Sequence, residues 1–155
     1  MSVPPMTSGE LPANRYVRPA AVVAPSLEAH PQRVWAAWQI SVDRKLRELG
    51  NVLENWDSYG GSPVSAEAIR VARELVFDLA GIPGLASPLV AASPEGSVGL
   101  AWTSGDVSLE VEIRDDGEAT WTWVGTDPDR DRHGRVTSLA PFVELTAIDT
   151  ARAGA

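Results

Sequence analysis

Apolar residues recur at helical spacing through residues 35–56, and this stretch predicts an amphipathic helix. They lie three or four positions apart: Trp35, Trp38, Val42, Leu46, Leu49, Leu53 and Trp56. Charged residues such as Asp43, Arg44 and Glu48 fall mostly between them, so the apolar side chains form one stripe. Pro31 suits the first turn, where its missing N–H leaves no hydrogen bond unmade. The stripe favours a helix that faces a core; the alternative is a short coiled-coil seam between two chains.

A second helix is predicted after a break at Gly60-Gly61. Pro63 follows the break, and Ser65 is a suitable N-cap, with Glu67 near the positive end of the helix. Apolar residues then continue at helical spacing: Ala68, Ala72, Leu75, Val76 and Leu79. The connection is short, so the two helices should be antiparallel neighbours.

Beyond the second helix the apolar period changes to two, which predicts antiparallel strands. Strands are expected at residues 89–92, 98–103, 107–114 and 119–124. Asp115-Asp116-Gly117 is a strong hairpin signal between the last two. The apolar face of this meander should pack on the helices, whereas the face that carries Ser108, Glu110 and Glu112 should meet water.

The remaining segments complete the expected fold. Residues 125–135 are dominated by charge and predict a loop, and a short closing helix near residues 140–148 is favoured over a fifth strand. The fold class is α+β: two antiparallel N-terminal helices packed on a three- to four-stranded antiparallel β-meander, with a short C-terminal helix. The expected organisation is a flexible Pro/Ala-rich N-terminal arm (1–28), a single α+β domain (29–149) and a disordered C-terminus (150–155). Within the arm, Val17 and the Ala20–Ala24 run are candidates for contact with the domain.

Composition narrows the classes of function. A chain of 155 residues is long enough for one domain with a packed core. The lack of Cys excludes a disulfide scaffold, a thiolate zinc site and a Cys nucleophile. A net charge of −8 argues against nucleic-acid binding, which needs a basic surface, and it attracts basic partners. Because neither a signal peptide nor a long apolar span is evident, a cytoplasmic protein with no membrane partner is expected.

The segment from Asn55 to Pro63, Asn-Trp-Asp-Ser-Tyr-Gly-Gly-Ser-Pro, is the most informative motif. Its Asn and Asp side chains can accept hydrogen bonds from nearby backbone N–H groups, and its glycines allow positive φ angles. One interpretation is a connector in which Trp56 fills the gap between helices and sheet. The other makes Trp56, Asp57 and Tyr59 a recognition surface, since aromatic residues are enriched in interface hot spots.

Two acidic patterns remain. Glu110 and Glu112 share one strand face about 7 Å apart, which is compatible with paired-carboxylate catalysis but is common on the wet face of a sheet. Residues 127–131 have the Asp spacing of a calcium loop, yet Arg132 stands where that loop needs Gly and Ser138 where it needs Glu. A solvated loop with local ion pairs is the preferred interpretation.

No complete catalytic constellation is recognisable. The two histidines, His30 and His133, lie far apart in the chain, and neither a nucleophile elbow nor a phosphate-binding loop is present. We therefore expect no catalytic residue, no cofactor and no bound metal.

The Asn55–Pro63 segment also carries a resemblance. It is similar to an N-W-D-x-x-G-x-x-P motif that precedes a helix in an uncharacterised family of small bacterial and phage proteins. In those proteins a Ser-Pro-x-x-Gly turn and Trp- and Glu-rich strands follow, and this chain matches with Ser93-Pro94-Glu95-Gly96, Val98–Trp102 and Leu109–Ile113. The resemblance covers roughly residues 45–124. It implies a fold but no established activity.

These patterns favour a non-enzymatic protein–protein interaction module, such as an inhibitor, an antitoxin-like protein or an accessory protein in a phage or host-defence setting. Its partner would be another protein with a basic surface, and a homodimer is an open alternative. The candidate partner-binding residues are Trp56, Asp57, Tyr59, Glu110 and Glu112. A second hypothesis is a small-ligand module that stacks a sugar or base on Trp102, Trp121 and Trp123. A small hydrolase is the third, least favoured hypothesis.

Overall fold

The computed structural model describes residues 36–155, which form an α+β fold of three α-helices and one five-stranded antiparallel sheet. The predictions for the N-terminal arm, Trp35 and His30 lie outside the described residues. The elements in chain order are α1 (Trp38–Leu49), α2 (Ala66–Leu79), β1 (Leu89–Ala92), β2 (Val98–Ser104), β3 (Val107–Ile113), β4 (Ala119–Val124), the 3-10 helix η2 (Pro128–Arg130), β5 (Arg132–Arg135) and α3 (Ala140–Ala153). The predicted fold class is confirmed.

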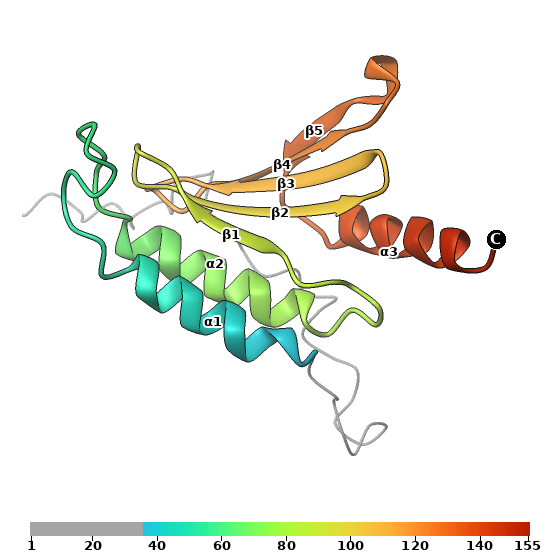
Figure 1. Ribbon diagram of the computed structural model, residues 1–155, viewed down its shortest axis with the longest axis horizontal. Helices are drawn as coiled ribbons and strands as arrows, with labels where there is room; N and C mark the ends of the chain where they lie inside the picture. The colour runs from blue at the N-terminus through green and yellow to red at the C-terminus, as the bar shows by residue number, and fades with distance from the viewer. Residues whose placement is uncertain (1–35) are drawn as a thin grey trace, which may run out of the picture.

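The sheet is a simple meander, because each strand pairs with the next in the order β1-β2-β3-β4-β5. All three helices lie against one face of it: α2 crosses below the strands, α1 packs against α2 and β1, and α3 covers the end near the β2–β3 turn (Figure 1). The opposite face, which we call the open face, has no helix over it among the described residues.

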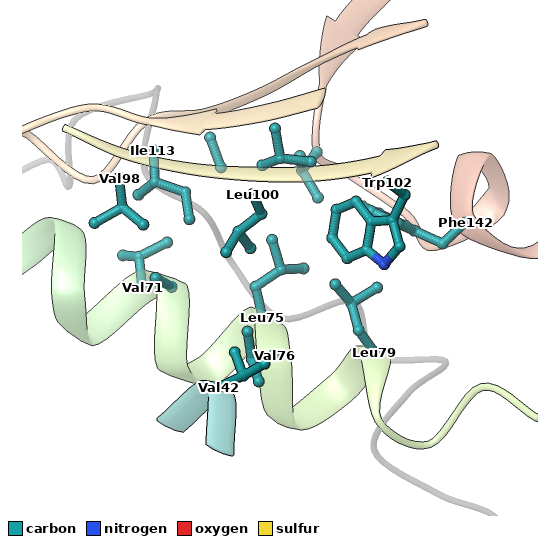
Figure 2. Close-up of a cluster of buried hydrophobic side chains, with 14 of the residues drawn as sticks. Val42, Val71, Leu75, Val76, Leu79, Val98, Leu100, Trp102, Ile113 and Phe142 are labelled. Carbon is teal, nitrogen blue, oxygen red and sulfur yellow. The ribbon is translucent and has the colours of Figure 1, made fainter. Parts of the chain in front are cut away.

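The core lies between the sheet and the helices, as the alternating strand pattern requires. In Figure 2, Val71, Leu75 and Leu79 of α2 point toward Val98, Leu100 and Trp102 of β2. Ser65 caps α2 as predicted, since its hydroxyl accepts a hydrogen bond from the Ala68 N–H at 2.9 Å. These buried side chains give the largest favourable contribution to folding, at about 25 cal/mol per Å² of apolar surface.

Helix α1 is shorter than the apolar stripe predicts. It ends at Leu49, with Gly50 as its C-cap, so Leu53 and Trp56 lie beyond the helix and not on its stripe. The physical reason is local: Gly is a poor helix former, and the Asn51 side chain donates a hydrogen bond to the Arg47 carbonyl at 3.2 Å. The remaining stripe is correct, because Val42 and Leu46 are buried.

The C-terminal third differs from the prediction in two places. Part of the predicted charged loop is a fifth strand, β5, whose backbone pairs with β4 from Thr120 to Trp123. Helix α3 is confirmed but continues to Ala153, although the sequence predicts an end near residue 148 and disorder from residue 150. Ion pairing between Arg152 and Asp106 and a hydrogen bond between Asp149 and Ser104 hold these last turns on the sheet.

The loop between α1 and α2 lies at one end of the molecule, whereas the C-terminus lies at the other (Figure 1). Within residues 36–155, no helix combines the length and the apolar character needed to cross a membrane.

Candidate functional site

The segment Asn55–Pro63, which we call the aromatic loop, is fixed by hydrogen bonds to its own backbone. Asn55 accepts at its side-chain oxygen from the Gly60 N–H (2.7 Å), and its own N–H donates to the Gly61 carbonyl (2.7 Å). Asn55 and Ser58 both have positive φ angles, 59° and 66°. Left-handed conformations of this kind cost energy outside glycine, so the hydrogen bonds are what hold this loop in one shape.

Asp57 is the centre of this hydrogen bonding. Its Oδ1 atom accepts from the Tyr59 N–H at 2.9 Å and from the Gly61 N–H at 2.8 Å. These two backbone donors favour the ionised form and hold the pKa of the Asp57 carboxyl below its ordinary value. The carboxylate is therefore committed to the shape of the loop.

The close packing around Asp57 explains one of the glycines. A Cβ atom at Gly61 would lie 2.8 Å from the Asp57 carboxylate, closer than van der Waals contact allows. Only glycine at position 61 leaves room for both hydrogen bonds of Asp57, so this part of the motif is architectural.

The loop presents apolar surface to solvent. Tyr59 is 94% exposed, Leu53 just before the loop is 79% exposed, and Trp56 is 38% exposed. The interpretation of Trp56 as a plug between helices and sheet is wrong. Its indole N–H instead donates to the Ser62 carbonyl at 3.0 Å, so the ring closes the loop from outside the core. Large aromatic side chains presented by a fixed backbone at an exposed tip are typical of interface anchors.

A short bridge joins the aromatic loop to the sheet. The Ser62 N–H donates to the Pro94 carbonyl at 2.8 Å, and the Ser65 N–H donates to the Gly96 carbonyl at 3.1 Å. Gly96 has φ +82° and lies so close that an added Cβ would sit 2.8 Å from the Pro63 carbonyl oxygen. The loop is therefore hydrogen-bonded to the β1–β2 turn and packs closely against it.

The open face begins at the same turn. Ser97 donates from its hydroxyl to Glu112 at 3.1 Å. Strand pairing places Leu89, Ala101, Glu110, Thr122 and His133 in one row across the five strands. A parallel row contains Ala91, Gly99, Glu112, Thr120 and Arg135. Together the two rows outline a shallow trough of about 390 Å³ from β1 to β4.

The trough is lined by small side chains and by two acidic ones. Its lining residues from β1 and β2 are mostly small or apolar, and among residues 36–155 the only charged side chains that line it are Glu110 and Glu112. Both carboxylates are exposed, as the alternation predicts. Within residues 36–155, no side chain pairs with Glu110. The two acidic residues therefore form a surface that attracts cations.

The indoles proposed to stack a ligand lie on the other side of the sheet. Trp102 and Trp123 are buried among the core residues, and the Trp102 indole N–H donates to the Ala86 carbonyl at 2.9 Å. Trp121 is half-buried on the same face, with its indole N–H donating to the Arg135 carbonyl at 3.1 Å. Their orientation makes them core residues, so the described residues give the trough no aromatic platform for a sugar or base.

The acid and base candidates for the hydrolase hypothesis lie on different strands of the sheet. His133 lies two strands from Glu110, with Thr122 between them, which is about 10 Å by ordinary strand spacing. Within residues 36–155, no hydrogen bond or ion pair joins these two side chains as an acid–base pair. Within the described part of the chain, no group of three His, Cys, Asp or Glu side chains could hold a metal ion. The Asp-rich segment 127–131 is a capped turn, in which Asp127 accepts from the Asp129 N–H at 3.1 Å.

Sequence reasoning missed two parts of this surface. Leu53 belongs to the exposed patch beside Trp56, and the signal is the helix stop at Gly50-Asn51 that precedes it. The floor of the trough is formed by Ala91, Gly99 and Ala101, which are small residues alternating with core residues. That alternation of small and large side chains is visible in the sequence.

A scan against protein-family models gives no match, and neither do searches of curated proteins and of solved structures.

Proposed function

We propose that the protein is a non-enzymatic protein-interaction module that binds a partner with a basic surface, as an inhibitor, an antitoxin-like protein or an accessory protein. The observation that carries the proposal is the aromatic loop, which exposes Tyr59 and Trp56 on a backbone fixed by its own hydrogen bonds. A backbone that is fixed before association loses little conformational entropy on binding, so a rigid loop that presents aromatic side chains favours tight binding.

Charge supports the basic partner. Glu110 and Glu112 lie on the open face that continues from the loop through the β1–β2 turn. With a net charge of −8, the protein attracts cationic surfaces over a range that salt shortens. In this proposal the aromatic loop supplies most of the affinity, and the acidic face raises the association rate.

The test is affinity purification from the native host with tagged full-length chain, followed by measurement of Kd for the purified partner. Tyr59→Ala is the sharpest variant, because a 94% exposed side chain contributes little to folding. We expect it to weaken binding by about thirtyfold, the effect of a 2 kcal/mol hot spot. Ile40→Ala, which removes a 72% exposed apolar side chain on α1, is the matched control and should leave Kd unchanged.

The charged face is measured separately. Glu110→Gln with Glu112→Gln should slow association and flatten its salt dependence, with little change in dissociation. The proposal fails if no stoichiometric protein partner is recovered at several salt concentrations, or if Tyr59→Ala and Ile40→Ala bind equally well.

A further inference from the structure

The open face of the sheet changes from apolar to acidic along its rows. Its β1 and β2 strands contribute Leu89, Ala91 and Ala101, which leave an apolar floor with Leu89 73% exposed. Strand β3 contributes Glu110 and Glu112, followed by the threonines of β4. A guest that complements this face is therefore apolar where it crosses β1 and β2, and cationic where it reaches β3.

The chain itself contains such a sequence, in the part that lies outside the described residues. Residues 11–27 carry Arg15 and Arg18 and no acidic residue. The five residues from Ala20 to Ala24, Ala-Ala-Val-Val-Ala, are all apolar and follow the two arginines. The segment thus has the composition that the face requires, in an otherwise acidic protein.

The order of these residues along the chain also fits. The described chain enters beside β1, because the indole N–H of Trp38 donates to the Leu85 carbonyl, at 2.9 Å, just ahead of Leu89. Residues 28–35 can span about 26 Å when extended, which exceeds the thickness of one sheet. A segment that turns around the β1 edge would bring the Ala20–Ala24 run over β1 and β2 first, and the arginines over β3.

We propose that the segment of residues 11–27 docks on the open face of its own sheet, with Arg15 and Arg18 paired to Glu110 and Glu112. Basic β5 residues border the far side of the face: Arg135 is paired to Glu118 at 3.3 Å, and His133 lies in the outer row. These residues limit the cationic part of the guest to β3. Because docking covers the carboxylates, the segment competes with a basic partner for this face; that regulatory consequence, unlike docking itself, rests on the proposed function.

The experiment uses the absence of Cys from the chain. In full-length protein, Val22→Cys is combined with Ala91→Cys on the open face, or with Arg44→Cys on the exposed side of α1 as the matched control. Disulfide formation under mild oxidation is followed by mass spectrometry, with circular dichroism to confirm that each variant is folded. We expect about tenfold more intramolecular disulfide in the Ala91 pair, because docking raises the local concentration of the two thiols.

Charge exchange then tests the arginines. Adding Glu110→Arg and Glu112→Arg should reduce the disulfide yield to that of the control pair, and adding Arg15→Glu and Arg18→Glu as well should restore it. Equal disulfide yields in the two cysteine pairs would overturn the proposal. It would also be overturned if the variant with all four charge exchanges is folded but does not regain its disulfide yield. A disulfide-linked dimer would assign the face to a second copy and also overturn it. None of these readouts involves a partner, so they are independent of the Tyr59→Ala result.

Discussion

Asp57 shows how one side chain can decide the shape of a surface. Its carboxylate accepts two backbone N–H groups, from Tyr59 and Gly61, and thereby holds Tyr59 at the tip of the aromatic loop. An exposed carboxylate would ordinarily be read as a binding or catalytic group. Here its Oδ1 atom is directed inward to the loop backbone, so the carboxylate positions the backbone of its aromatic neighbour Tyr59.

This arrangement predicts a pH dependence of the loop. The pKa of Asp57 is lower in the folded protein than in the unfolded chain, chiefly because of the Tyr59 N–H and then the Gly61 N–H. The stabilisation is therefore complete above the ordinary carboxyl pKa of about 4, and it is lost as the pH falls through the lowered folded value. Amide NMR shifts of Tyr59 and Gly61 should move together in that acid range.

Asp57→Asn is the matched variant, because it keeps the shape and removes the titration. Its Tyr59 and Gly61 amide shifts should show no common acid transition, whereas its loop should be less protected from hydrogen exchange at neutral pH. Identical titration curves for the two proteins would contradict the assignment.

At this scale the sequence indicated the right residues but not their orientation. Asn55 and Asp57 were readable as acceptors for nearby backbone N–H groups, because short polar side chains do this in turns. The exposed position of Trp56 could not be predicted, because the apolar residues continue at helical spacing as far as Trp56. Its exposure depends on where α1 ends, which is decided by Gly50 and Asn51 and not by hydrophobicity.

Among the elements, α3 attaches to the sheet through few buried side chains. Phe142 is fully buried, and its ring meets the Trp102 indole edge-on, with centroids 5.4 Å apart. Leu145 adds a second buried side chain. The helix therefore depends on a small apolar contact plus polar contacts along its last turns.

Phe142→Ala should destabilise the protein by about 3–5 kcal/mol, because it leaves a cavity against Trp102. Urea unfolding followed by tryptophan fluorescence measures this, since the indole lies at the cavity. Val143→Ala, at a 52% exposed position on the same helix, is the control and should change stability by less than about 0.5 kcal/mol. Similar losses for the two variants would show that α3 does not pack as described.

The elements were predicted with unequal success for a physical reason. Strands with alternating apolar residues, such as Val98–Ser104, were recognisable because one face is buried. Strand β5 was not, because Arg132–Arg135 has no apolar alternation and is held by backbone pairing at the edge of the sheet. Edge strands rich in charge carry little periodic signal, although charge protects an edge from unwanted pairing.

The whole molecule carries a net charge of −8, which pushes the compact state apart. Apart from the two pairs that Arg114 and Arg135 form with the buried Glu118, the described ion pairs are exposed or half-exposed, and each contributes little. Salt screens both the repulsion and the ion pairs. The stability gained from the weaker repulsion should therefore exceed the stability lost from the weaker ion pairs. We expect the melting temperature to rise by about 2–4 °C between low and moderate salt, which corresponds to about 1 kcal/mol. Sucrose at matched osmolarity is the control for non-ionic effects, and a falling melting temperature would contradict this balance.

The separation between the aromatic loop and the chain's end has a practical consequence. The C-terminus lies at the opposite end of the molecule from the α1–α2 loop, which contains Tyr59 (Figure 1). A sensor chip, bead or fluorophore attached through the C-terminus would leave the loop directed away from the support. The same attachment at a loop residue such as Ser58 would bury the tip against the support. Comparing immobilisation through the two ends of the molecule would thus report which end receives a partner before that partner's structure is known.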